Sequence, residues 1–97
     1  MALKDTLRNM LKYAREKNEP TRVRLIHGLA IAIKVSGEMV QLQLSRNDVS
    51  PSMQEWRTVI QAIPGQCTVV DEPRLIKTES AYYLKGKIKI VKELING

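Results

Sequence analysis

Three lysines stand two residues apart near the end of the chain, at Lys85, Lys87 and Lys89, with apolar residues or glycine between them. Side chains two residues apart lie on one face of a strand, so a strand here would carry the three ammonium groups in a row. Such a row could contact the phosphates of a nucleic acid. The same pattern occurs on strands whose lysines prevent edge-to-edge aggregation. Both interpretations remain open at this point.

A second basic row occurs near the N-terminus, at Lys4, Arg8, Lys12 and Arg15. The spacing of three and four residues places these side chains along one flank of a helix. Like charges at i and i+4 destabilise a helix by roughly 0.2–0.5 kcal/mol per pair, so their clustering favours a function. Nearby acids could equally neutralise them.

Positive charge is concentrated at both ends of the chain, whose net charge is +6. Residues 1–24 carry seven Lys or Arg against three acids, residues 25–73 three against five, and residues 74–97 six against two. Segregated positive charge attracts phosphate backbones and other anionic surfaces. Nucleic acid is therefore one expected partner.

The residue types that carry catalysis are scarce. His27 is the only histidine and Cys67 the only cysteine, and neither has a metal ligand or a nucleophile partner at a recognised spacing. The glycines are scattered and form no phosphate-cradling loop. We expect no enzyme activity, no metal and no cofactor, with Cys67 an inert core thiol.

The length and composition indicate one small domain spanning residues 1–97. The chain is 43% hydrophobic and 27% charged, as in ordinary globular proteins. Its longest uncharged stretch, Thr58 to Val70, is 13 residues, well short of the ~20 apolar residues that span a bilayer. Charges interrupt every apolar run near the N-terminus, so no secretory signal is expected. These features predict a cytoplasmic protein with no membrane partner.

The first two elements follow from apolar periodicity. Apolar residues at helical spacing predict a helix over Leu3 to Lys17, which Pro20 prevents from continuing. Large apolar residues then occupy odd positions from Val23 to Val35, which predicts one long strand.

A hairpin should follow, with a two-residue loop at Ser36-Gly37. This loop pairs Val35 with Glu38 and places Ile31 opposite Leu42. A slip of one residue would place glutamines opposite the isoleucines, so this hairpin register is the most strongly specified local structure of the chain.

The second half predicts a helix and two strands. The helix begins near Ser50 or Ser52, since either serine could cap it, and ends before Pro64-Gly65 with Trp56 in the core. The pattern predicts a strand over residues 67–70, a turn at 71–73 and a longer strand over 81–90. Residues 74–80 and 91–97 fit no single element and are left unassigned. The expected fold is α+β, a single two-layer domain in the order α-β-β-α-β-β, with a mostly antiparallel sheet and two helices on one face.

The uncovered face of this sheet would carry the candidate sites. The nucleic-acid candidates are Lys85, Lys87, Lys89, Tyr83, Arg22, Arg24 and Lys34 on the sheet, and Lys4, Arg8, Lys12 and Arg15 on the helix. With few exposed aromatic side chains on which bases could stack, phosphate contacts with little sequence specificity are expected. The alternative is a protein-interaction or homo-oligomerisation surface, formed by Gly28, Ala30, Ala32, Gln41 and Gln43. The sequence does not distinguish DNA from RNA or from a protein partner, and it assigns neither the oligomeric state nor the strand order.

Overall fold

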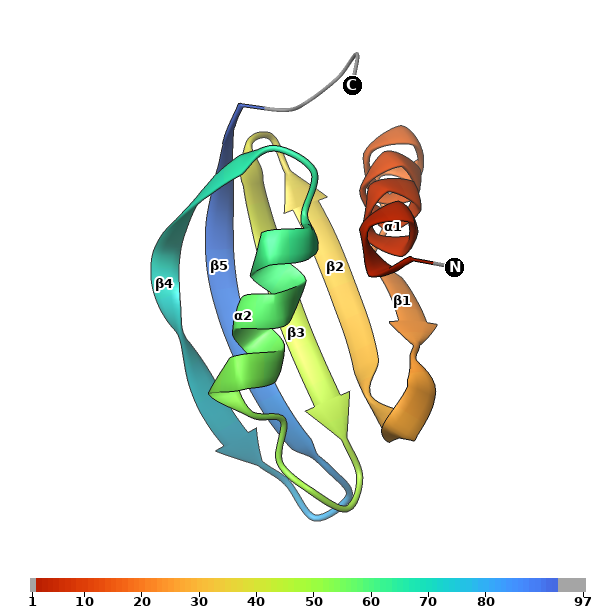
Figure 1. Cartoon of the computed structure of the whole chain (residues 1–97), viewed down its shortest axis with the longest axis vertical. Coiled ribbons are helices and arrows are strands. Elements are labelled where there is room, and N and C mark those ends of the chain that lie inside the picture. Colours follow the sequence, from red (N-terminus) through yellow and green to blue (C-terminus); the bar gives the residue numbers. More distant parts are fainter. Residues whose placement is uncertain (1, 93–97) are drawn as a thin grey trace.

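The computed structural model describes residues 2–92 as an α+β fold with two helices and a five-stranded antiparallel sheet (Figure 1). The helices are α1 (Leu3–Lys17) and α2 (Met53–Ala62), with a short 3-10 helix, η1 (Ile26–Gly28), and the strands are β1 (Thr21–Arg24), β2 (Ala30–Ser36), β3 (Met39–Arg46), β4 (Gln66–Lys77) and β5 (Tyr82–Lys92). The strand order is β1-β2-β3-β5-β4, so β1 and β4 form the two edges.

Both helices begin and end where local chemistry requires. Helix α1 has the predicted bounds and is followed by Asn18 in the left-handed region, at φ 53°. Helix α2 begins after Ser52, whose hydroxyl accepts a hydrogen bond from the Glu55 amide while the Glu55 carboxylate accepts one from the Ser52 amide. This capping box identifies Ser52, not Ser50, as the cap.

One hydrophobic cluster joins both helices to the sheet. It contains Leu7, Met10 and Leu11 of α1, Trp56 and Val59 of α2, and the alternate strand residues Ile31, Ile33, Val40, Leu42, Leu44, Leu84, Ile88 and Ile90. Trp56 is 3% exposed, which confirms the predicted core position. We call the sheet side that carries these strand residues the helix-facing side, and the opposite side the open side.

The predicted strand over Val23 to Val35 is wrong, because the chain reverses in its middle. His27 and Gly28 both have positive φ, 61° and 72°, and the chain folds back so that β1 pairs antiparallel with β2. Val23 lies opposite Ile31 across this turn. The odd-numbered apolar pattern continues through the reversal, which is why it resembled one strand. Counting only the longer helices and strands, the described order is therefore α-β-β-β-α-β-β, with seven elements instead of the predicted six.

The predicted hairpin register is wrong by two residues. The loop residues are Gly37 and Glu38, Ser36 pairs with Met39, and Ile31 lies opposite Leu44 rather than Leu42. Gly37 has φ 62° at the first central position of the turn, which suits glycine there. Because an even shift preserves the faces, the isoleucines of β2 still oppose leucines and stay on the helix-facing side.

Strand β4 replaces the turn predicted at residues 71–73. It runs from Gln66 to Lys77 and pairs with β5 throughout, but its register shifts between Val69 and Asp71 and again between Asp71 and Arg74. These bulges accommodate Pro73, whose missing N–H is tolerated on an edge strand. Residues 74–77, left unassigned from sequence, therefore belong to a strand, as do 91 and 92; residues 93–97 lie outside the described part of the chain.

Candidate functional site

The open side of the sheet gathers basic side chains from four strands. We call this surface the basic face, and it consists of Arg22 and Arg24 (β1), Lys34 (β2), Arg74 (β4), and Lys85, Lys87 and Lys89 (β5). Six of the seven are the sheet residues predicted from sequence, and Tyr83 lies on the same side. The structure thus brings together every strand cation of the prediction.

Strand register explains how residues far apart in sequence share this face. One row across the sheet reads Arg22, Ala32, Gln43, Lys85 and Arg74, and the next reads Lys34, Gln41, Lys87 and Asp71. Directly paired residues of antiparallel strands place their side chains on the same side of a sheet. The two glutamines therefore lie between the arginines of β1 and the lysines of β5.

Few acids oppose these cations. Among the described residues, Asp71 approaches Lys87 at 3.9 Å and Glu38 approaches Lys89 at 3.4 Å, both on exposed or half-exposed side chains. Such pairs contribute about 0–1 kcal/mol each. Arg74 and Lys85 lie directly opposite each other, and in the described chain neither forms an ion pair. Like charges directly opposite in a sheet are destabilising, so this pair does not stabilise the fold.

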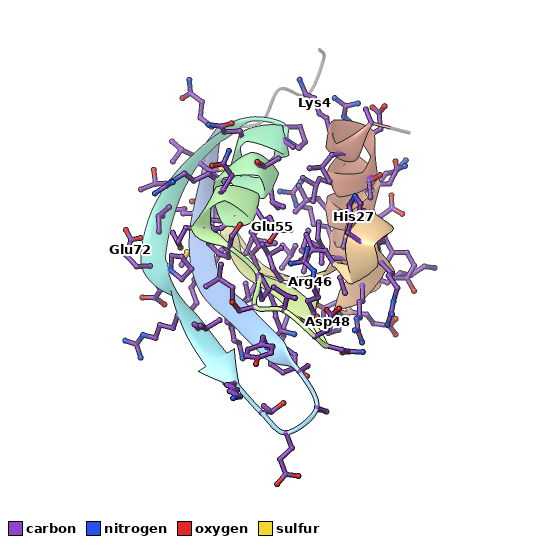
Figure 2. The ribbon with its side chains drawn as sticks, turned by 60° about the horizontal axis from the view of Figure 1, so that its bottom comes forward. Lys4, His27, Arg46, Asp48, Glu55 and Glu72 are labelled. Atoms are coloured by element: carbon purple, nitrogen blue, oxygen red, sulfur yellow. The ribbon has the colours of Figure 1, made fainter. Side chains whose placement is uncertain are left out.

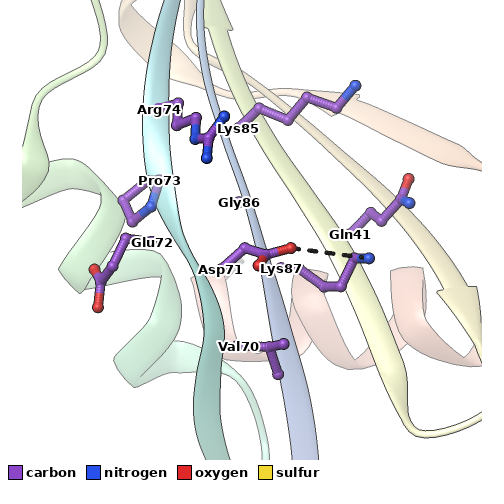
Figure 3. A pocket seen from close by; sticks show the side chains of 9 residues that line it. All are labelled: Gln41, Val70, Asp71, Glu72, Pro73, Arg74, Lys85, Gly86 and Lys87. Carbon is purple, nitrogen blue, oxygen red and sulfur yellow. Dashed lines mark ion pairs between the residues drawn. The ribbon is translucent and has the colours of Figure 1, made fainter.

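A hollow of about 440 Å³ opens in the basic face where β4 bulges away from β5. Its lining includes Arg74, Lys85, Lys87, Gln41 and Asp71. Figure 3 shows Arg74 reaching over β5, Lys85 extending over β3, and Glu72 turned to the opposite side of β4. A smaller hollow of about 180 Å³ adjoins it and shares Gln41 and Lys85.

Arg74 and Asp71 were missed by the sequence analysis, which assigned a turn to residues 71–73. The sequence signal that could have located Arg74 was the turn-forming segment at residues 78–81. A hairpin closed there pairs Lys77 with Tyr82, and counting back along both strands brings Arg74 opposite Lys85.

The four basic residues of α1 lie on a different surface. Lys4, Arg8, Lys12 and Arg15 are exposed, and Arg8 forms an ion pair with Asp5 at 3.2 Å. Helix α1 packs through Leu7, Met10 and Leu11 into the cluster on the helix-facing side. The structure therefore does not join this row to the basic face.

Four of the five residues proposed as an alternative interface lie on the open side of the sheet, and only Gly28 lies apart from them. Gly28 lies in η1, outside the strands. Ala30 is only 2% exposed, and Ala32 pairs between Arg22 and Gln43. Gln41 and Gln43 remain on the open side, where they belong to the same surface as the lysines.

Three side chains with shifted pKa values, Arg46, Glu55 and Cys67, do not belong to the basic face. Arg46 donates to both carboxylate oxygens of Glu55 and, through Nε, to the carbonyl of His27 at 3.1 Å. Figure 2 labels these three residues. The Arg46 hydrogen bonds lower the pKa of Glu55, and the Glu55 hydrogen bonds raise that of Arg46. Burial raises the pKa of the Cys67 thiol, which keeps it protonated.

This Arg46-Glu55 pair borders an apolar hollow of about 430 Å³ between α1, η1 and α2. Because each partner satisfies the other, the arrangement serves to join η1, β3 and α2. Within residues 2–92, no three or more His, Cys, Asp or Glu side chains form a group suited to a metal ion.

No family model, curated protein or solved structure matches this chain. Neither helix described in residues 2–92 has the length and apolar character required to cross a membrane.

Proposed function

We propose that this chain is a small non-catalytic domain that binds nucleic acid through phosphate contacts on the basic face, with little sequence discrimination. The observation that carries the proposal is the convergence, among residues 2–91, of seven cations from four strands on one side of the sheet, against two acids that pair with them. A surface of this sign raises the local concentration of phosphate backbones and accelerates their association.

The pairing of Arg74 with Lys85 across the strands supports the same proposal. A sheet selected only for stability would separate like charges or pair them with acids. A phosphate placed near both side chains would neutralise them and turn a destabilising arrangement into a favourable one.

A second candidate function is association with a protein, because strand β4 exposes apolar side chains at the edge of the sheet. Val69, Val70, Leu75 and Ile76 are 38%, 47%, 57% and 42% exposed. Against this candidate, the bulges and Pro73 interrupt the edge, and both features block regular pairing with another strand.

The test is to titrate the full chain into a mixed pool of DNA and RNA at 50 and 200 mM salt, while measuring its mass in solution. Charge-driven binding should be strong at the lower salt and fall steeply at the higher one. A domain that binds neither nucleic acid at the lower salt would contradict the proposal, and a stable oligomer in the same sample would then support the second candidate.

A further inference from the structure

The basic face is too wide to enter a groove of duplex DNA. Five strands with four spacings of about 4.8 Å extend across about 19 Å of backbone, whereas the major groove is about 12 Å wide. That groove admits a helix or a two-stranded ribbon. The helices do not protrude from the open side, because their buried residues pack into the cluster on the other side. A duplex could therefore contact this surface through its outer phosphates but could not present its base edges to it.

A single strand fits the same surface. Lys85, Lys87 and Lys89 recur every two residues along β5, so their Cα atoms are separated by roughly 7 Å. Beside this row, Gln41 and Gln43 of β3 offer amide donors and acceptors to unpaired base edges, and half-buried Tyr83 offers an aromatic ring. Sheets bind single strands by this combination of a charged track and exposed base contacts.

The bulge of β4 adds a defined position to this track. Arg74 pairs with Lys85 next to the bulge, in the register set by the loop at residues 78–81, and Lys87 lies on the same side one pair further along. A guanidinium group recognises phosphate oxygens through paired N–H donors. In this hollow, Asp71 forms an ion pair with Lys87 and not with Arg74.

We infer that the hollow beside the β4 bulge is a phosphate site, formed by Arg74, Lys85 and Lys87, that anchors a single-stranded nucleic acid on the basic face. This inference rests on the proposed function and names its substrate class. Asp71 competes with the phosphate for Lys87, so it limits affinity at this position.

The experiment compares a single-stranded oligonucleotide with a duplex of the same length and sequence, using the full chain and three variants. Arg74→Gln should weaken single-strand binding roughly tenfold, as expected for the loss of a charge-assisted hydrogen bond. Asp71→Asn should tighten it. Arg57→Gln, which removes an exposed arginine from α2, is the matched control and should change affinity less than about twofold, as a long-range charge effect.

A second measurement locates the site without nucleic acid. Inorganic phosphate, added to labelled protein, should shift the backbone amide resonances of Arg74, Lys85 and Lys87 before those of Lys4 and Lys12. Duplex binding as tight as single-strand binding would overturn the inference, and so would equal losses for Arg74→Gln and Arg57→Gln. In both cases the proposed function would stand.

Absence of any oligonucleotide binding would overturn the inference and the proposed function together. Vesicles containing anionic phospholipid form a separate arm. Binding to vesicles without binding to oligonucleotides would assign the phosphate site to lipid headgroups and exclude the single-strand inference.

Discussion

Gly86 of β5 lies directly against the indole of Trp56. A Cβ atom at position 86 would approach Cη2 of Trp56 to 2.7 Å and the carbonyl oxygen of Asp71 to 3.0 Å. The glycine in the lysine-rich strand is therefore required by packing on the helix-facing side, while its neighbours Lys85 and Lys87 occupy the open side.

Gly86→Ala should destabilise the fold by about 1–3 kcal/mol, because the added methyl group overlaps the ring and the bulge backbone. Urea unfolding monitored by circular dichroism would measure the change. Lys85→Ala is the matched control in the same strand and should have a much smaller effect. An unchanged midpoint for Gly86→Ala would show that the ring has room to move.

Gly28→Ala should also destabilise the protein, but for a conformational reason. No atom lies within 4 Å of a Cβ at this position, whereas its φ is 72°. The left-handed conformation costs a non-glycine residue about 1–2 kcal/mol. His27→Gly in the same turn should relieve a comparable strain at φ 61°, partly offset by greater entropy of the unfolded chain. A thermal melt of both variants should show a lower melting temperature for Gly28→Ala and a higher one for His27→Gly. A lower melting temperature for His27→Gly would contradict the strain argument.

Trp56→Ala should cost on the order of 3–5 kcal/mol, since the ring is buried between α2 and the sheet. Because such a loss could unfold a small domain, Trp56→Phe provides a milder second variant. Native tryptophan emission should resist quenching by iodide. Ready quenching in the folded wild-type protein would place the ring at the surface.

Glu55→Gln should cost about 1.5–3 kcal/mol at neutral pH, as expected for hydrogen bonds to a charged group. Arg46 would lose the carboxylate that raises its pKa. The folded state lowers the pKa of Glu55 below 4.5, so its contribution is complete above that pH and is lost as pH falls through the folded-state value.

Denaturation curves at pH 7 and at pH values below 4.5 would test this dependence. The stability difference between wild type and Glu55→Gln should shrink as pH falls. A difference that stays constant across this range would show that the carboxylate charge does not contribute.

Replacing Lys85, Lys87 and Lys89 by glutamine should reduce the slope of log affinity against log salt by about 2 units, since each single-strand phosphate contributes about 0.7. Stability should change little, because their two ion pairs are exposed. The matched triple variant at Lys4, Arg8 and Lys12 should leave the slope nearly unchanged. An equal reduction in both would show that total charge, not the basic face, governs binding.

The sequence predicted the elements whose signals are local and failed where long-range geometry decides. Helix α1 was predictable because apolar spacing and Pro20 agree. The side of the sheet on which each residue of the β2–β3 hairpin lies was predictable, but the register was not. Aliphatic residues at every second position still meet aliphatic partners when the pairing shifts by two residues. The reversal at His27 was hidden because the large apolar residues stay at odd positions both before the turn, as at Val23, and after it, as at Ile31.

The candidate site shows the same division. Parity alone placed the lysines of β5 and the arginines of β1 on one side. Arg74 was missed because residues 71–73 were assigned a turn and residues 74–80 were left unassigned, so no strand was expected at this position. The two bulges each insert one residue, and together they leave Arg74 on the side that simple alternation from Val69 gives. The hollow likewise depends on the path of β4, which no pattern within residues 71–74 indicates.

Gly86 lines the hollow beside the β4 bulge, and it also lies against the indole of Trp56 on the other side of the sheet. Only the backbone of β5 at Gly86 separates the buried Trp56 indole from the hollow lined by Arg74 and Lys85. The fluorescence of Trp56 can therefore report on the opposite side of the sheet. Displacement of the bulge by a bound phosphate would alter the carbonyl dipole of Asp71 near the indole, so occupancy could be followed by emission wavelength without an attached dye.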